Sequence, residues 1–247
     1  MGDHTIRDHR DYGVIDLATI IKKSSNIGAS KIALSLEPLE FWSILRNVGF
    51  GQTTGSGFPG EASGFLNPYN NWSEVEQATM SFGYGISTTA LQLAQAYMPF
   101  ATDGMMLPVS FLKVSELVTA SRVFSAGVAR QVRTMLETVV QKGGTGYRAA
   151  IEGYRVAGKT GTVLKTVAGG YSEDRYLSLF AGMAPASNPR LIAVVMIDEP
   201  KGDQYYGGLV AAPVFSKVMA GALRLLDIPP DDLPVLNGQI IAAGRIN

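Results

Sequence analysis

Two short polar motifs hold the side chains best suited to chemistry in this sequence. Ser24-Ser25-Asn26 places two hydroxyl groups next to a carboxamide, and Lys159-Thr160-Gly161-Thr162 places an ammonium group and two hydroxyl groups around a glycine. A lysine ammonium favours deprotonated neighbours and binds anions. Each motif alone also has an ordinary structural explanation, because Ser-x-Asn is typical of helix caps and Lys-Thr-Gly is common in loops.

The segments around the first motif have helical spacing. Residues 14–23 place apolar side chains at helical intervals and end in two lysines, which suit the negative end of a helix dipole. Serine and asparagine prefer caps and turns, and residues 27–36 resume an apolar helical pattern. We therefore expect Ser24 and Asn26 at a tight junction between two helices. Further helices are predicted over residues 39–48, 73–82, 88–101 and 126–140.

The hydrophobic period changes from helical to alternating at Tyr154. Three strand-like runs, 154–165, 176–184 and 190–198, are separated by short connections that favour antiparallel hairpins. Residues 209–226 predict a long helix that covers one face of this sheet. The chain is thus expected to be an α+β protein, an antiparallel sheet covered by helices, with Lys159 in the first strand.

The remaining stretches are irregular. Residues 49–71 are rich in Gly, Pro, Asn, Ser and Thr and predict a long ordered surface loop, and residues 107–114 predict an extended piece. Pro229-Pro230 ends the last helix. We assign residues 1–228 to one partial domain and residues 229–247 to a flexible C-terminal tail.

Composition argues against several classes of protein. Twenty-one basic and twenty-one acidic residues, without a run of like charge, argue against nucleic acid as a partner. The chain has no cysteine, and His4 and His9 fall short of the three or four donors of a metal site, so no metal or other cofactor is expected. No run approaches the roughly 18 to 20 apolar residues of a membrane span. We expect the 247 residues to be soluble, with any anchor or signal outside them.

Taken in this order, with the lysine motif entering a hairpin, the two motifs resemble the second and third active-site motifs of serine penicillin-recognising enzymes. The chain is similar to the class B penicillin-binding proteins, above all the division-specific penicillin-binding protein 3 group, over nearly its whole length. The resemblance implies a β-lactamase/transpeptidase-like fold, present here as a partial domain, and peptidoglycan D,D-transpeptidase activity in the parent protein. Besides the two motifs, the matching segments are Phe58-Pro59-Gly60-Glu61, Ser81-Phe82-Gly83-Tyr84-Gly85, Phe180-Ala181-Gly182, Gly207-Gly208 and Pro213-Val214-Phe215.

The resemblance implies catalytic roles for Ser24, Asn26 and Lys159. In the family, the hydroxyl that corresponds to Ser24 belongs to the proton relay and delivers a proton to the leaving amine, and the amide that corresponds to Asn26 bonds the substrate backbone. Lys159 places its positive charge beside this relay and the substrate carboxylate. A shared site predicts that the Ser24 hydroxyl lies within hydrogen-bonding distance, or one water molecule, of the Lys159 ammonium.

The remaining residues of the lysine motif would bind the substrate. The hydroxyls of Thr160 and Thr162 would donate to the substrate carboxylate, and the Thr162 N–H would supply half of the oxyanion hole. Gly161 removes a side chain that would block the approach of an extended stem peptide, which could pair with this strand as an added strand.

Four tyrosines match by neighbourhood the residues that wall the ligand groove in the family. Their alternative interpretation is that they are ordinary half-buried tyrosines, and a glycine pair favours the groove interpretation for the last two. Leu164 departs from close relatives, which often carry a basic residue there, and this affects side-group preference among β-lactams. The four candidates are Tyr84, Tyr176, Tyr205 and Tyr206.

The family's first motif, Ser-x-x-Lys, supplies the nucleophile from the start of a helix. Its one literal match here, Ser110-Phe111-Leu112-Lys113, follows Pro108 in a stretch that predicts extended chain, which sends Ser110 and Lys113 to opposite faces. We interpret it as a chance match. The chain is then expected to be a fragment, or a gene remnant, that lacks the acylated serine and is inactive alone.

Two other functions stay open. A serine β-lactamase or D,D-carboxypeptidase shares both motifs, but the Phe58-Pro59-Gly60-Glu61 loop favours the transpeptidases. A catalytically silent module that binds stem peptide or a protein partner is the third possibility. The resemblance implies the D-Ala-D-Ala stem peptide and β-lactams as ligands, and divisome or elongation proteins as partners. It places the parent protein at the periplasmic face of the inner membrane, in cell-wall or septum synthesis.

Overall fold

The structure is a computed structural model that describes residues 5–114, 119–167, 170–233, 235–236 and 239–240. His4 and residues 241–247 of the predicted tail lie outside the described residues. None of the described helices is both long and apolar enough to cross a bilayer.

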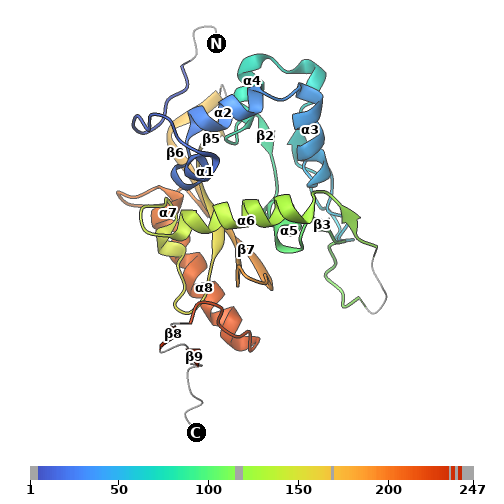
Figure 1. The fold of residues 1–247 in the computed structure, drawn as a ribbon. Coiled ribbons are helices and arrows are strands. Elements are labelled where there is room, and N and C mark those ends of the chain that lie inside the picture. Colours follow the sequence, from blue (N-terminus) through green and yellow to red (C-terminus); the bar gives the residue numbers. More distant parts are fainter. Residues whose placement is uncertain (1–4, 115–118, 168–169, 234, 237–238, 241–247) are drawn as a thin grey trace.

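Six helices precede the sheet, at the places where the sequence predicts them. Side-chain caps explain most of their starts: Asp16 caps the first, Ser73 and Thr89 form capping boxes, and Ser125 caps the longest. Figure 1 shows that the longest of them runs across the middle of the molecule. The helices are α1 (Leu17–Lys23), α2 (Asn26–Leu34), α3 (Pro38–Asn47), α4 (Glu74–Met80), α5 (Ala90–Ala101) and α6 (Ala126–Val140).

Three strands form the antiparallel sheet that the alternating period predicts. They are β5 (Ala157–Val167), β6 (Gly170–Ala184) and β7 (Leu191–Asp198), in the order β5-β6-β7. The first strand begins three residues later than predicted, because Tyr154 instead closes a turn with Ile151 and its hydroxyl donates to the Ile228 carbonyl at 2.6 Å. Antiparallel order is confirmed, and β5 lies at an edge of this sheet.

The final helix is broken into two pieces. The predicted 209–226 helix is divided at Ala211 into α7 (Gly207–Val210) and α8 (Ala212–Leu225), with Pro213 in the first turn of α8. Proline is tolerated there because the first helical N–H groups have no intrahelical partner.

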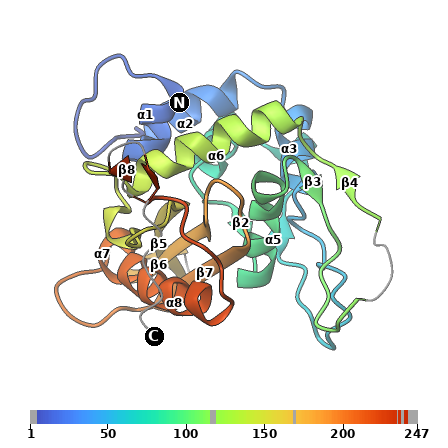
Figure 2. The same ribbon diagram turned by 60° about the horizontal axis from the view of Figure 1, so that its bottom comes forward.

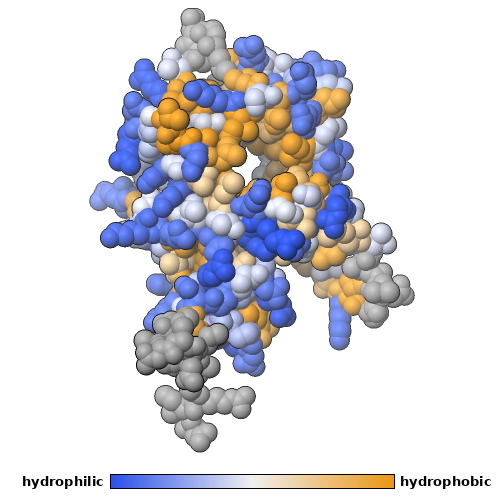
Figure 3. Space-filling view, in the orientation of Figure 1, coloured by the Kyte–Doolittle hydropathy of each residue, from blue (hydrophilic) through white to orange (hydrophobic). Residues whose placement is uncertain are grey.

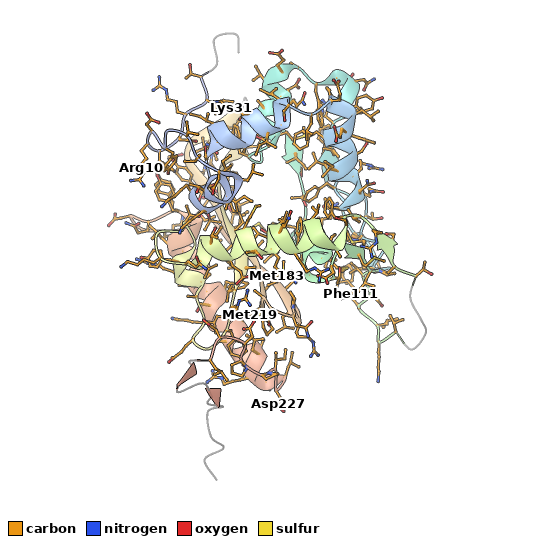
Figure 4. All side chains as sticks on the ribbon, viewed as in Figure 1. Arg10, Lys31, Phe111, Met183, Met219 and Asp227 are labelled. Carbon is orange, nitrogen blue, oxygen red and sulfur yellow. The ribbon has the colours of Figure 1, made fainter. Side chains whose placement is uncertain are left out.

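Helices cover both faces of the sheet (Figure 2). On one face the ring of Phe180 packs 4.7 Å from that of Phe215 on α8, and both side chains are fully buried, as is Met219 nearby. On the other face Met183 packs with Leu136 of α6. Figure 4 shows Met219 on α8 and Met183 beside α6. The sheet is therefore the centre of the core, as the α+β prediction requires.

The long 49–71 loop is largely irregular and ordered by side chains, as predicted. The fully buried Gln92 amide donates to the carbonyls of Gln52 and Ser63 at 2.6 and 2.7 Å, and the Glu61 carboxylate accepts from the Thr54 N–H at 2.7 Å. Hydrogen bonding to Thr54 lowers the pKa of Glu61. Two short strands and a 3-10 turn accompany the loop: β1 (Phe65–Leu66) pairs with β2 (Ile86–Ser87), and η1 spans Tyr69–Asn71.

Helices α2 and α3 present apolar residues to solvent. Figure 3 shows hydrophobic residues gathered on the upper part of this face, around a hollow above α6. The exposed apolar residues of these two helices are Ile27, Ile32, Leu39 and Ile44.

Contacts to the segments that flank the sheet continue past residue 228. The Asp231 carboxylate accepts from the backbone N–H groups of Arg155 and Ser187, at 2.7 and 3.0 Å, and the Asp232 N–H donates to the Gly153 carbonyl at 3.0 Å. A short hairpin of β8 (Val235–Leu236) and β9 (Gln239–Ile240) follows. The division of the chain into a domain and a tail at residue 228 stays a prediction.

Candidate active site

The junction of α1 and α2 is held by two consecutive serines with different tasks. Ser24 takes a left-handed backbone conformation, φ 56° and ψ 49°, and its N–H closes the end of α1. Ser25 caps α2 by accepting from the Gly28 N–H at 2.9 Å, and it donates to the Asp8 carboxylate at 2.6 Å. Because Ser25 does the capping, the Ser24 hydroxyl is free to turn away from both helices.

Lys159 of β5 meets Ser24 across this junction. Its Nζ donates to the Ser24 Oγ at 2.8 Å and to the Thr160 carbonyl at 3.1 Å. The predicted proximity of the two groups is therefore found, although 135 positions separate them in the chain. Burial lowers the pKa of Lys159 to about 8, because desolvation penalises the charged ammonium. A lysine with this pKa can hold or release a proton near neutral pH.

Both threonines of the lysine motif point to the face of β5 opposite Lys159. Thr160 donates to the Thr145 hydroxyl at 3.0 Å, and the Thr162 hydroxyl accepts from the Gly207 N–H at 2.9 Å, where α7 begins. These contacts lie on the face opposite Lys159, because side chains alternate along a strand. One ligand can reach Lys159 and both threonines only along the outer edge of β5, which pairs with no strand among the described residues.

Gly161 is required by the sheet itself. A Cβ atom at this position would lie 2.2 Å from the Leu179 Cδ1 on β6, the cross-strand partner of Gly161. Leu179 thus fills the space that a side chain at position 161 would need. The predicted role of Gly161 in admitting a stem peptide stays a prediction beside this structural reason.

We expect Gly161→Ala to destabilise the chain by about 1 to 3 kcal/mol, the usual cost of overpacking a filled site. Urea unfolding measures the change. Leu179→Ala in the same chain removes the atom that clashes, so the alanine at position 161 should cost much less in that background. An equal cost in both backgrounds would show that Leu179 is not the reason for the glycine.

Asn26 is the first residue of α2 and lies in a pocket of about 380 Å³. Tyr84 lines the same pocket, so these two predicted site residues come together. The other lining residues are Thr5, Ile6, Arg7, Val75, Thr79 and Phe82.

Three of the four predicted tyrosines form one cluster. The ring of Tyr205 stacks on that of Tyr176 at 4.0 Å and lies 4.5 Å from that of Tyr206, whose hydroxyl is 3.2 Å from its own. Tyr84 instead packs edge-on against Tyr171 at 4.9 Å. The pKa of Tyr176 is raised, mainly by desolvation and to a smaller extent by the nearby Tyr205. The sequence analysis did not include Tyr171 among the site residues, although its position as an aromatic residue beside the β5-β6 turn could have indicated it.

Ser178 and Thr145 also belong to the surroundings of the site and were not predicted. Ser178 is fully buried and donates to the Tyr205 carbonyl, which fixes the backbone of the tyrosine cluster. Thr145 lies just past the predicted 126–140 helix, in a stretch to which the sequence analysis gave no role. Its contact with Thr160 has no sequence signal.

The chance Ser-x-x-Lys match lies far from this site. The Ser110 hydroxyl accepts from the Leu112 N–H at 3.1 Å in an irregular, exposed stretch after β3 (Met105–Met106), which bends at Phe111 and Leu112 and does not run extended as predicted. Figures 1 and 2 place β3 and its partner β4 (Ser121–Arg122) at the end of α6 opposite α7, and Figure 4 places Phe111 there. Ser110 therefore cannot act on a ligand held by Ser24 and Lys159.

Comparison with known proteins identifies the family. Residues 1–220 match the model of the penicillin binding protein transpeptidase domain. The chain belongs to this family. It is 44% identical over 230 residues to a probable peptidoglycan D,D-transpeptidase PenA of Neisseria flavescens, covering 93% of this chain and 58% of the relative. It is 43% identical to the peptidoglycan D,D-transpeptidase FtsI of Escherichia coli K12, covering 93% of this chain and 39% of that relative.

A solved structure gives the same fold. The apo transpeptidase domain of penicillin-binding protein 3 from Burkholderia pseudomallei superposes with a TM-score of 0.87 at 47% identity, over 92% of this chain and 69% of that one. The predicted β-lactamase/transpeptidase-like fold is confirmed. The transpeptidase family member described here spans about two fifths to three fifths of the length of its curated relatives.

Proposed function

We propose that this chain carries the second and third active-site motifs of a peptidoglycan D,D-transpeptidase, which cross-links stem peptides that end in D-Ala-D-Ala. The observation that carries the proposal is the 2.8 Å hydrogen bond from the Lys159 ammonium to the Ser24 hydroxyl. It joins the two motifs at one point of the fold. The family membership and the relatives named D,D-transpeptidases support the same reaction.

The geometry suits acyl transfer. A serine of a Ser-x-x-Lys segment loses its hydroxyl proton to a base and attacks the carbonyl of the penultimate D-Ala, so that a C–O bond forms and the bond to the terminal D-Ala nitrogen breaks. The departing amine needs a proton, which Ser24 can deliver and recover through Lys159, whose lowered pKa suits proton exchange near neutral pH. The nucleophile must come from outside the 247 residues, since Ser110 lies elsewhere.

Substrate binding fits the edge of the sheet. An extended stem peptide that pairs with β5 would run between Lys159 on one face and Thr160 and Thr162 on the other. Asn26 and Tyr84 line the neighbouring pocket, and the cluster of Tyr176, Tyr205 and Tyr206 supplies aromatic surface for the peptide or a β-lactam side group.

The two other functions differ in what they predict. A β-lactamase or carboxypeptidase would release its acyl group to water, and a silent module would bind stem peptide without any acylation. The 43 to 44% identity over 93% of the chain to named transpeptidases favours the first proposal over both. We further propose that the whole protein acts in cell-wall or septum synthesis, at the periplasmic face of the inner membrane, with divisome or elongation proteins as partners.

Labelling with a fluorescent penicillin tests the proposal. We expect no covalent adduct on the 247-residue chain, because penicillin acylates the serine of the Ser-x-x-Lys motif. We expect a stable adduct once the Ser-x-x-Lys segment of the Burkholderia domain is fused ahead of residue 5. Intact-protein mass spectrometry reads both results.

Each contrary outcome points to a different alternative. An adduct on the chain alone, mapped to Ser110, would overturn our assignment of that motif. An adduct on the fusion that hydrolyses within seconds would favour a β-lactamase. A folded fusion that binds penicillin only reversibly would favour the silent module.

A further inference from the structure

The loop that follows α6 touches α1, β5, β6 and α7, four of the elements around the proposed site. We call residues 143–146, Gly-Gly-Thr-Gly, the clasp. On the α1 side, the Lys23 Nζ donates to the Gly143 carbonyl at 2.6 Å, and the Thr145 N–H donates to the Lys22 carbonyl at 3.3 Å. Lys22 and Lys23 are the last two residues before Ser24, so the clasp is fixed to the helix end that presents the Ser24 hydroxyl.

On the sheet side, the clasp meets the lysine motif and the start of α7. Thr160 donates to the Thr145 hydroxyl at 3.0 Å. A Cβ atom on Gly208 would lie 2.1 Å from the Thr145 carbonyl, and one on Gly146 would lie 2.7 Å from the Phe180 ring. Glycine at these positions therefore allows the clasp to pack directly against β5, β6 and α7.

The clasp has little freedom to move. The Gly146 N–H donates to the Val139 carbonyl at 3.0 Å, and a Cβ atom on Gly144 would lie 2.0 Å from the same carbonyl oxygen. Gly144 and Gly146 are buried, and only Thr145 between them carries a side chain. Thr145 thus holds the end of α1 through its backbone and β5 through its hydroxyl.

We propose that Thr145 is a positioning residue for the site: it fixes the separation of Ser24 from Lys159 by joining the Lys22 carbonyl to the Thr160 hydroxyl. Either threonine hydroxyl can donate to the other. Thr145 can therefore keep its hold on Thr160 when the Thr160 proton turns toward a substrate carboxylate. The geometric part of the inference concerns this chain alone, and its value for catalysis rests on the proposed function.

The pKa of Lys159 shows whether the separation of Ser24 from Lys159 is maintained. Burial is what lowers the pKa of this lysine, so a site that opens and admits water returns the pKa toward 10.5. In a chain labelled with ¹³C-lysine, the chemical shifts of the ε-carbons, measured by NMR as a function of pH, give the pKa of each lysine. The resonance of Lys159 is assigned as the one that the Lys159→Met variant lacks. This readout needs no catalytic activity.

We expect Thr145→Val to raise the pKa of Lys159 by about one unit or more, because valine keeps the shape and loses the hydroxyl. Thr145→Ser should restore the original titration. Thr138→Val is the matched control: its hydroxyl donates only to the Met135 carbonyl of its own helix, at 2.6 Å, and its loss should leave Lys159 unchanged.

A folded Thr145→Val chain with an unchanged Lys159 titration would overturn the inference. If Thr145→Val does not fold, Thr160→Val decides instead, since it removes the same hydrogen bond between the two hydroxyls from the other side and changes no charge. A rise in the Lys159 pKa supports the clasp, and no change overturns it. Should the Burkholderia fusion fail to bind penicillin while Thr145→Val still shifts Lys159, the proposed function would fall and the positioning role would stand.

Discussion

Lys159→Ala is expected to slow penicillin acylation of the Ser-x-x-Lys fusion by about 10² to 10³-fold, the loss seen when one preorganised electrostatic group is removed from an acyl-transfer site. The alanine removes both the ammonium that donates to Ser24 at 2.8 Å and the positive charge beside the carboxylate position. Ser24 would keep its place at the end of α1 but lose its partner. Labelling with fluorescent penicillin, quenched at a series of times, gives the second-order rate constant of acylation.

The same strand offers a matched control. Lys165 forms ion pairs with Asp198 at 2.7 Å and Glu199 at 2.8 Å, on the far side of the motif from Ser24. Because this network is partly exposed and makes no contact with Ser24, Lys165→Ala should change the acylation rate by less than about threefold. Equal losses in the two variants would mean that charge on β5 in general matters, and that the contact between Ser24 and Lys159 does not.

The sequence predicted the elements of this fold where local signals are strong. Four helices begin at side-chain caps within their own segments, at Asp16, Ser73, Thr89 and Ser125. The change of hydrophobic period at Tyr154 indicates the start of the sheet. Such signals depend on neighbours in the chain, so they can be read without knowing the fold. The pairing of Ser24 with Lys159 needed the family resemblance as well, since nothing local links them.

What the sequence could not predict depends on contacts between distant segments. At the start of α7, the Gly207 N–H donates to the Thr162 hydroxyl, 45 positions away in the chain. Thr145 and Asp8 gain their roles from Lys22 and Ser25, through hydrogen bonds that have no periodic pattern. Tyr84 packs against Tyr171, whereas Tyr176, Tyr205 and Tyr206 form a separate cluster of contacts.

The remaining large effect is on the pH dependence of the chain itself. The pKa of Lys159 in the folded chain is about 8, whereas an unfolded lysine titrates near 10.4. Folding therefore favours the neutral amine. The stability that this lysine contributes is fully present above the unfolded pKa, and it is lost as the pH falls through the folded pKa near 8.

Between pH 8 and 9.5 we expect the free energy of unfolding to rise by about 1 to 2 kcal/mol more in the chain than in Lys159→Met. The lower part of this range applies if the half-buried side chain keeps contact with water. Above pH 10 the partly buried Tyr97, whose pKa is raised by desolvation, acts in the opposite direction, so the measurement stops below that point. Urea unfolding gives the free energies, and the ¹³C titration gives the pKa of Lys159. A pKa near 10.4 together with parallel pH profiles for the two chains would mean that water reaches the ammonium freely. Lys159 would then be a permanent charge beside Ser24 and could not exchange protons with it.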